Sequence, residues 1–376
     1  MFDLAVVGGG PAGVAAATAA VAQGLRVCLL DNAHSRAFQV GETLLPSANA
    51  TLAEQGLHAL LETGPHLRSY GTSAVWGGTE IGYRDFIFGV QGLGWHLDRR
   101  AFNVQLRDHA RACGVCVRKV TVIGATLADG QATLNLAGLR NVSTLVARFV
   151  IDASGRHAVV ARAAGADACV MHDRLVAVAH RFTGNCTSGG PPLGVRALVE
   201  ACELGWWYVA PLPGQRVIAA LFTDSDLAVA AGAMDRRGWR ALLEQSHVSA
   251  AILRPLRRLP GKALVRPAST TQRRPMRGAG WLAVGDAAMT FDPLCSQGIA
   301  KALRGGQAAA LAASAWLGRN DDSWLVACAH ESAALFAEFM ALRQAYYSQE
   351  PRWAQAPFWL RRRRPANAPA PDLPNA

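Results

Sequence analysis

The feature that most constrains the fold is a glycine-rich turn between two apolar segments at the start of the chain. Residues 2–7 are typical of a buried parallel strand, and residues 14–23 of an alanine-rich helix. A second strand over residues 25–30 ends at Asp31, and the turn, residues 8–13, reads GGGPAG. This order of strand, G-x-G-x-x-G turn, helix, strand and acid is the dinucleotide-binding fingerprint of a doubly wound α/β sheet.

Each position of the turn has its own physical role. Gly8 permits the tight turn, Gly10 lets the backbone approach a pyrophosphate, and Gly13 lets the helix pack closely on the strand. Pro11 and Ala12 begin the helix, whose free N–H groups and dipole attract phosphate. We therefore predict that these residues bind the phosphates of a dinucleotide.

The acid at the end of the second strand completes this half of the site. Asp31 is placed to accept hydrogen bonds from the ribose hydroxyls of the adenosine, and Asn32 follows it at the same sheet edge. Both are predicted to contact the cofactor.

Composition places the chain among folded globular proteins. Of its 376 residues, 51% are hydrophobic and 17% are charged, which is enough to bury a large core divided into two lobes. Because the fingerprint starts at residue 2 and apolar stretches elsewhere are short, we expect no signal peptide and no membrane span, and we predict a cytoplasmic location. The eight cysteines and ten histidines follow no metal-ligand spacing, so no metal site is indicated.

The net charge of +11 comes mostly from arginine. No nucleic-acid-binding motif accompanies it, so we expect no nucleic-acid partner. Two explanations of this charge are close: arginines on a solvated surface, or a surface that binds an anionic cofactor and an acidic protein partner. We favour the solvated surface by a narrow margin.

A second phosphate and hydroxyl site is predicted near the other end of the chain. Residues 280–288 are typical of a buried strand that ends in Gly-Asp, and an alanine-rich helix follows a loop that contains Pro293. Asp286 can bond a ribityl hydroxyl, and the N–H groups of Gly298 and Ile299 can cap an electron-accepting ring. A further strand over residues 149–156 also ends in Asp-x-x-Gly.

These three segments, in this order, resemble those of the flavoprotein monooxygenase superfamily, where they surround FAD. The resemblance implies an α/β protein with a doubly wound, Rossmann-type FAD domain like that of glutathione reductase, a mainly antiparallel β substrate domain and a helical C-terminus. The expected divisions are residues 1–70, 95–165 and 274–320 for the FAD domain, 71–94 and 166–273 for the substrate domain, 321–364 for the C-terminal helical segment, and 365–376 for a disordered tail.

Two further segments narrow the resemblance to flavin-dependent halogenases and their relatives. Residues 41–46 look like the G-E-x-x-x-P of that group, which adds Glu42 and Thr43 to the expected cofactor contacts. Residues 94–102 resemble its W-x-x-D-R-x-x-F segment, whose arginine approaches the cofactor and corresponds to Arg99. The strand after the helix over residues 100–112 resembles the family strand at which Val120 would contact adenine.

Within this branch, residues 73–77 and the tail from residue 346 most resemble the flavin hydroxylases that mature quinone-cofactor amine dehydrogenases and amino-acid oxidases. Those enzymes oxygenate a tryptophan side chain of a partner protein. Halogenases need a lysine beyond the glutamate segment, yet residues 64–82 contain none. Their W-x-W-x-I-P segment is only partly kept in residues 206–211, which read WWYVAP. The sequence therefore favours a hydroxylase.

The reaction that the resemblance implies starts with FAD reduced by NAD(P)H or by a separate flavin reductase. A flavin C4a-hydroperoxide would then transfer oxygen to an electron-rich aromatic ring, with a tryptophan side chain of a peptide or partner protein as the leading substrate. Ser296 and Gln297, in the loop expected to face the flavin, are the candidate catalytic residues.

Several alternatives stay open from the sequence. Trp76, Trp206 and Tyr208 fit the walls of a substrate pocket and fit core packing equally well. A flavin-dependent halogenase and a flavin saturase like geranylgeranyl reductase share the same motifs, and so would a non-catalytic assembly factor. The aromatic residues over 346–359 suit an interface, but packing of a C-terminal helix onto the FAD domain is the better explanation. An amphipathic helix is predicted over residues 322–347.

Overall fold

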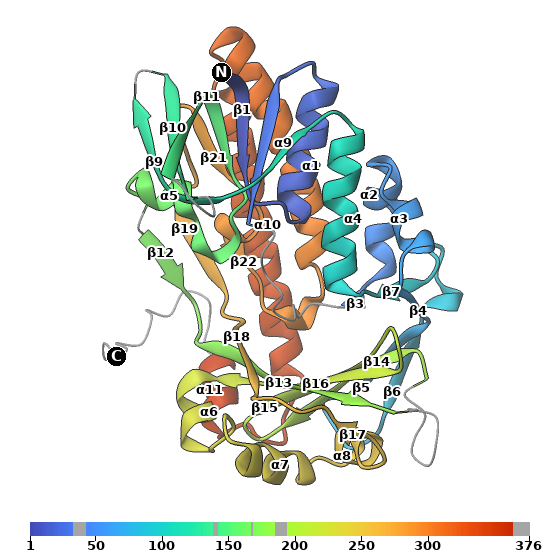
Figure 1. Ribbon diagram of the computed structural model, residues 1–376. Helices are drawn as coiled ribbons and strands as arrows, with labels where there is room; N and C mark the ends of the chain where they lie inside the picture. Colours follow the sequence, from blue (N-terminus) through green and yellow to red (C-terminus); the bar gives the residue numbers. More distant parts are fainter. Residues whose placement is uncertain (33–42, 129, 138–141, 167, 185–193, 364–376) are drawn as a thin grey trace.

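The computed structural model describes residues 1–32, 43–128, 130–137, 142–166, 168–184 and 194–363. Figure 1 shows a mainly parallel sheet with its helices lying above a mainly antiparallel sheet, with the long helix α10 extending between the two. The prediction of a doubly wound α/β domain joined to an antiparallel β domain is confirmed. Glu42 and the predicted tail over residues 365–376 lie outside the described residues.

The parallel sheet has the strand order β20-β21-β11-β1-β2-β8, and the hairpin β9-β10 pairs with β11. β1, β2, β8, β11 and β21 run parallel, and β20 runs antiparallel to β21. The strands span Phe2–Val7 (β1), Val27–Asp31 (β2), Cys116–Lys119 (β8), Thr121–Ala128 (β9), Gln131–Ala137 (β10), Val142–Asp152 (β11), Arg277–Gly278 (β20) and Trp281–Ala283 (β21).

Helices cover both faces of this sheet, because its central strands are apolar on both sides. Leu4 and Val6 of β1 pack with the helices α1 to α4 and α9, whereas Ala5 and Val7 pack with α5 and the hairpin. The helices span Pro11–Ala22 (α1), Asn49–Glu54 (α2), His58–Thr63 (α3), Arg99–Ala112 (α4), Val159–Ala163 (α5) and Gly298–Arg319 (α9).

The antiparallel sheet has the order β17-β13-β16-β15-β14-β5-β6, with β18 also paired to β13. Only β14 and β5 run parallel to each other. One face is covered by α6, α7 and α8, and the other by the C-terminal segment. The elements span Gly71–Val75 (β5), Gly82–Asp85 (β6), Leu175–Thr183 (β13), Arg196–Cys202 (β14), Gly205–Leu212 (β15), Arg216–Asp224 (β16), Arg257–Arg258 (β17), Leu264–Pro267 (β18), Ser225–Ala230 (α6), Arg236–Glu244 (α7) and Val248–Leu253 (α8).

Two small three-stranded sheets join the large ones, β3-β7-β4 and β12-β19-β22. The second contains β22, which follows the Gly-Asp segment, and also β12 and β19. In the sequence, β12 comes just before the strands β13 to β18 of the antiparallel sheet, and β19 comes just after them. The expected division at residue 166 therefore falls just before a shared sheet. The strands span Thr43–Leu44 (β3), Leu67–Ser69 (β4), Gly94–His96 (β7), Ala168–Met171 (β12), Thr271–Arg274 (β19) and Met289–Thr290 (β22).

The C-terminal segment forms α10, Ser323–Ser348, and α11, Pro357–Arg363. The helix predicted over residues 322–347 is confirmed, but the prediction that it is amphipathic is wrong, because its apolar residues do not gather on one face. Phe336, Phe339 and Tyr347 are buried, whereas Trp324 and Leu342 are exposed. The expectation that this segment packs onto the FAD domain is wrong for its end, because Tyr347 and Trp359 pack into the antiparallel sheet's core. Among the described residues, α10 alone has the length and composition to cross a membrane, and 17% of its most apolar stretch is buried.

Candidate active site

The glycine turn after β1 leaves open space where a pyrophosphate would approach. Gly8 has φ of +108°, and a Cβ there would lie 2.2 Å from the carbonyl oxygen of Ala153. A Cβ on Gly13 would lie 1.8 Å from the carbonyl oxygen of Gly8, so the turn and the helix require glycine at both positions. A Cβ on Gly10, in contrast, would meet nothing within 4 Å. Gly10 therefore faces the space that the fingerprint assigns to phosphate, with Pro11 at the first helical position.

The carboxylate of Asp31 is held at the end of β2. Its Oδ1 accepts a hydrogen bond from the backbone N–H of Gly9 at 3.0 Å, and Arg107 Nη1 lies 3.2 Å from its Oδ2. The N–H of Val120 donates to the Asp31 carbonyl oxygen at 3.2 Å, so Val120 lies beside the same strand end, and Asn32 follows on the exposed side. The residues predicted for the adenosine half thus lie together.

The Gly-Asp segment reaches this edge from the other end of the chain. Gly285 has φ of +58°, and a Cβ there would lie 3.0 Å from Ala12 Cβ at the start of α1. Asp286 follows, with its side chain 48% exposed. Ala12 also contacts α9, because a Cβ on Gly306 would lie 2.2 Å from the Ala12 carbonyl oxygen. Two segments far apart in sequence are therefore packed against one helix N-terminus.

The loop before α9 contains the two predicted catalytic residues. A short 3₁₀ turn over Pro293–Cys295 ends at Ser296, which has φ of +50°, a conformation that is uncommon outside glycine. Gln297 is the N-cap of α9, and a Cβ on Gly298 would meet nothing within 4 Å. Ser296, Gln297 and Ile299 are partly exposed, so the loop presents polar groups and backbone N–H groups at the site, but their catalytic role stays a prediction.

A hydrogen-bond chain joins the predicted cofactor residue Thr43 to the antiparallel sheet. His96, which is fully buried, can donate from Nε2 to the Val195 carbonyl oxygen at 3.1 Å, so its Nδ1 accepts from the Thr43 hydroxyl at 3.0 Å. The Thr43 oxygen then accepts from the Tyr208 hydroxyl at 2.5 Å. Burial lowers the pKa of His96 to about 4, which keeps the ring neutral at neutral pH. Tyr208 and Thr43 are thus in direct contact across the two sheets.

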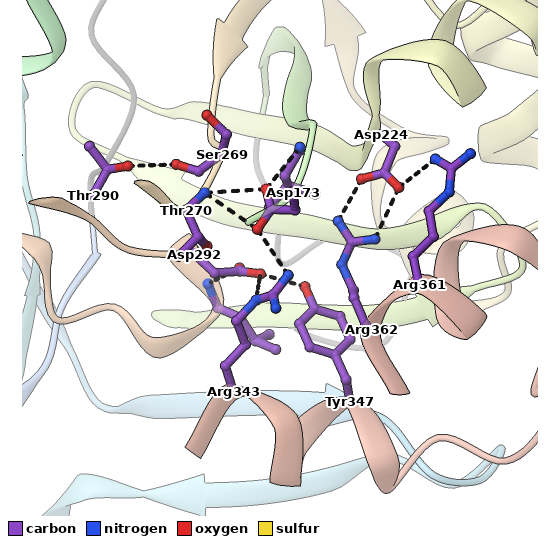
Figure 2. A network of polar contacts seen from close by, with 12 residues as sticks. Asp173, Asp224, Ser269, Thr270, Thr290, Asp292, Arg343, Tyr347, Arg361 and Arg362 are labelled. Atoms are coloured by element: carbon purple, nitrogen blue, oxygen red, sulfur yellow. Dashed lines mark hydrogen bonds and ion pairs between the residues drawn. The ribbon is translucent and has the colours of Figure 1, made fainter. Parts of the chain in front are cut away.

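A buried polar network, here called the C-terminal network, connects the loop before α9 to α10 (Figure 2). Asp292, which directly precedes Pro293, is fully buried, and its Oδ2 accepts from Arg343 Nε at 3.2 Å and from the Tyr347 hydroxyl at 2.7 Å. Arg343 Nη2 also donates to Asp173 at 2.9 Å, and Trp206 Nε1 donates to the Tyr347 oxygen at 3.0 Å. Burial raises the pKa of the Tyr347 phenol well above its usual range, so it remains a donor. The loop is therefore fixed by side chains from α10.

The helix α11 is attached to the antiparallel sheet by a second set of charges, centred on the buried carboxylate of Asp224. Asp224 of β16 accepts from Arg362 at 2.6 Å and from Arg361 at 2.8 Å, and Figure 2 shows both guanidinium groups converging on it. Glu350 accepts from the N–H of Gly77 at 2.9 Å. These contacts hold α11 and the end of α10 over the sheet face that carries Trp206.

The structure favours core packing over a pocket for two of the three predicted pocket residues. Trp206 is 1% exposed and stacks on Phe222, with ring centroids 4.0 Å apart. Trp76 packs edge-on against Trp359 and donates from Nε1 to the Tyr346 carbonyl oxygen at 2.8 Å. Tyr208 remains the predicted pocket residue that reaches toward the cofactor segment.

Other predicted positions have local structural roles. Arg99 is the first residue of α4, half-buried, with its guanidinium 5.8 Å from the Phe102 ring centroid, and its approach to the cofactor stays a prediction. Asp152, at the end of the third predicted strand, is buried and accepts from the N–H groups of Val160 and Ala161. It therefore holds the start of α5.

Sequence reasoning missed Arg343, Tyr347, His96 and Lys301. Arg343 and Tyr347 follow Phe339 at four-residue spacing in an otherwise apolar helix, and a lone arginine on such a buried stripe needs an acidic partner. This spacing in the sequence could therefore have predicted that Arg343 has a buried acidic partner. His96 carried no comparable signal, because its importance comes from Thr43 and Val195, which lie far from it in the chain.

These residues fit FAD. The open backbone at Gly10 and Gly298 can receive phosphate and an electron-accepting ring, and the carboxylates of Asp31 and Asp286 can accept from ribose and ribityl hydroxyls. Among the described residues, no three His, Cys, Asp or Glu side chains gather where they could hold a metal ion.

Comparisons with known proteins agree with this geometry. Residues 81–372 match the family described as tryptophan halogenase. The chain is 27% identical to the putative FAD-dependent oxidoreductase LodB of Marinomonas mediterranea, over 96% of each chain.

Two solved structures share the fold. The myxobacterial chondrochloren halogenase CndH has a TM-score of 0.86 and 23% identity, over 97% of this chain and 86% of that one. The peptidyl tryptophan dihydroxylase QhpG, described as essential for tryptophylquinone cofactor biogenesis, has a TM-score of 0.73 and 23% identity, over 96% of this chain and 78% of that one.

Proposed function

The chain belongs to the tryptophan halogenase family, and on that premise we propose that it hydroxylates an electron-rich aromatic ring, with a tryptophan side chain of a peptide or partner protein as the substrate. It is an FAD-dependent oxidoreductase of the halogenase-like, monooxygenase-type branch. FAD is its cofactor, and in this family a separate flavin reductase supplies the reduced flavin.

When bound, reduced FAD supplies the activation of molecular oxygen, and the protein positions the cofactor and the substrate. The backbone at Gly10 and the N-terminus of α1 would hold the pyrophosphate, while Asp31 and Asp286 would orient the sugar hydroxyls. The Tyr208 hydroxyl, bonded to Thr43, would hold its proton at the junction of the two sheets. The C-terminal helices cover the antiparallel sheet beside the loop and would limit access of water.

The observation that carries the hydroxylase proposal is the absence of a lysine from residues 64–82. The family's halogenases, as the resemblance implies, use a lysine beyond the glutamate segment to position hypohalous acid. Around the expected position the chain has Ala74 and Val75, which end β5, followed by Trp76, and none of these side chains can replace an ammonium donor. The fold shared with QhpG, which is described as a peptidyl tryptophan dihydroxylase, supports the same proposal.

Halogenation is the second candidate, favoured by the family match over residues 81–372 and by the fold shared with CndH. It would require a cationic group other than the expected lysine to direct the halogenating species. The third candidate, saturation of isoprenoid double bonds, is supported only by the fold.

Product mass decides between these candidates. The full chain would be given FAD, a flavin reductase with NADH, ¹⁸O₂ and a panel of tryptophan peptides, with and without bromide, and a separate isoprenoid panel. A peptide with phenylalanine in place of tryptophan is the matched control. We expect one or two ¹⁸O atoms in the tryptophan peptide, whether or not bromide is present.

Replacement of hydrogen by bromine would overturn the proposal in favour of a halogenase. Addition of two hydrogens to an isoprenoid, with no change to the peptides, would overturn it in favour of a saturase. The aromatic partner and the cytoplasmic location stay predictions, and a substrate accepted only within a folded protein would identify the partner.

A further inference from the structure

A buried lysine lies directly beneath the Gly-Asp segment of the flavin site. Lys301 is in the first turn of α9 and its side chain is 4% exposed. Its Nζ donates to the Met289 carbonyl oxygen at 2.6 Å, lies 3.6 Å from Asp286 Oδ1, and lies 4.3 Å from the centroid of the Phe291 ring. Burial lowers the pKa of Lys301, and the carboxylate of Asp286 opposes this shift because it favours the charged ammonium.

The pair of Lys301 and Asp286 has one buried and one exposed member. Asp286 is 48% exposed and faces the space that its motif assigns to the cofactor, whereas Lys301 is covered by the protein. A cation in this position cancels the charge of the carboxylate on the protein side of the site, where water cannot screen it well. Lys301 therefore sets the net charge that a bound flavin experiences from this segment.

Two other ionisable groups near Lys301 differ in their charge and in their distance from Asp286. Burial raises the pKa of the Cys295 thiol to about 11, so this group is neutral at neutral pH. Arg156 is half-buried and its Nη1 donates to the Ser269 carbonyl oxygen at 3.0 Å and hydroxyl at 3.2 Å. Arg156 keeps its positive charge and also attracts Asp286. Among the described residues, however, Lys301 is the cation within ion-pair distance of that carboxylate, at 3.6 Å.

We propose that Lys301, by neutralising Asp286, makes the site bind reduced FAD in preference to oxidised FAD. Reduced flavin carries one more negative charge than oxidised flavin at neutral pH, so a local change of one unit of protein charge affects the reduced form more. An enzyme that receives reduced flavin from a separate reductase must capture it in competition with the oxidised form. The proposal rests on FAD as the cofactor and is independent of which substrate is oxygenated.

The test compares the affinity for both forms of FAD and the midpoint potential of the bound flavin in a series of charge variants. Lys301→Met should weaken binding of reduced FAD about tenfold more than binding of oxidised FAD, which corresponds to a potential about 30 mV lower for a two-electron couple. Asp286→Asn should shift the potential in the opposite direction. Lys301→Met combined with Asp286→Asn restores a neutral pair and should return the potential close to that of the native protein.

Lys301→Arg, which keeps the charge, and Lys262→Met, which removes an exposed lysine outside this site, are the matched controls and should leave the potential unchanged. Equal weakening of both forms by Lys301→Met, or shifts of the same sign in Lys301→Met and Asp286→Asn, would show that Lys301 only supports the fold and would overturn the proposal. If Lys301→Met does not fold, the double variant and Lys301→Arg still test the proposal. Both should keep the native midpoint potential, and a shift in either would overturn the proposal. A native protein that bound neither form of FAD would overturn the cofactor assignment instead.

Discussion

At the nucleotide-binding edge of the parallel sheet, the site is formed by backbone groups of short segments, whereas at the junction with the antiparallel sheet it is formed by buried side chains. Gly8, Gly10 and Gly13 act within six consecutive residues, and each role follows from the absence of a side chain. At the junction, Asp292 meets Arg343 and Tyr347, which lie 51 and 55 positions further along the chain.

The difference shows two ways of fixing a cofactor. The nucleotide edge is rigid because its turn is sterically determined, so it requires few contacts from elsewhere. The loop at Asp292 ends in a left-handed Ser296, and the N–H of Leu294 donates to Asp292 Oδ1 within the loop. The other carboxylate oxygen, Oδ2, accepts from Arg343 and Tyr347 of α10. The position of the loop depends on charged partners from α10, so changes in the C-terminal helices should reach the flavin site while changes at the nucleotide edge remain local.

The largest expected effect comes from breaking the C-terminal network. Arg343→Met would leave Asp173 and Asp292 buried without their shared guanidinium, since the three side chains are at most 8% exposed. Loss of one partner of a buried ion pair costs about 3–5 kcal/mol, and we expect this loss in the free energy of unfolding measured with urea. The exposed helical pair Arg240–Glu244 offers a control, because Arg240→Met should cost no more than about 0.5 kcal/mol. Equal effects of the two substitutions would contradict the importance of the network.

The junction should also make stability depend on pH. His96 has its pKa lowered by burial from 6.5 to about 4, so the unfolded chain binds a proton in this range that the folded protein does not. The stabilisation is fully present above pH 6.5 and decreases as the pH falls toward 4, by up to about 3 kcal/mol.

Unfolding by urea between pH 7 and pH 4 measures this dependence in the native protein and in His96→Asn. In the variant, the slope of unfolding free energy against pH should be smaller by up to about 1.4 kcal/mol per pH unit, the contribution of one proton. The slope that remains includes the contribution of His180, whose pKa is also lowered to about 4. An unchanged slope in His96→Asn would mean that this ring has the same pKa in the folded protein as in the unfolded chain.

The nucleotide edge should show a smaller and purely local effect. Gly10→Val adds a side chain where nothing lies within 4 Å, so the fold should tolerate it, but the new methyl groups would occupy the space assigned to the pyrophosphate. We expect FAD affinity to fall at least tenfold, about 1.4 kcal/mol, with little change in the unfolding curve. Flavin fluorescence quenching measures the affinity, and full FAD occupancy in this variant would contradict the assignment of the turn.

Local sequence determined the nucleotide-binding half almost completely. The turn at Gly8, the helix start at Pro11 and the acid at Asp31 follow from chain geometry within thirty-one residues, so the pattern alone predicts their arrangement. Asp286 and Gly298 were predicted in the same way, because each lies at a strand end or a helix start.

Only the tertiary structure decided what surrounds these groups. The sequence gives no sign that Lys301 lies beneath Asp286, because the packing of α9 places it there. From the sequence, Trp206 fits a pocket wall as well as a core position, and its hydrogen bond to Tyr347 in the structure favours the core. The contact of Tyr208 with Thr43 likewise joins positions 165 residues apart. Such pairs carry no short-range pattern, because their energies depend on burial and on partners that only the folded chain brings together.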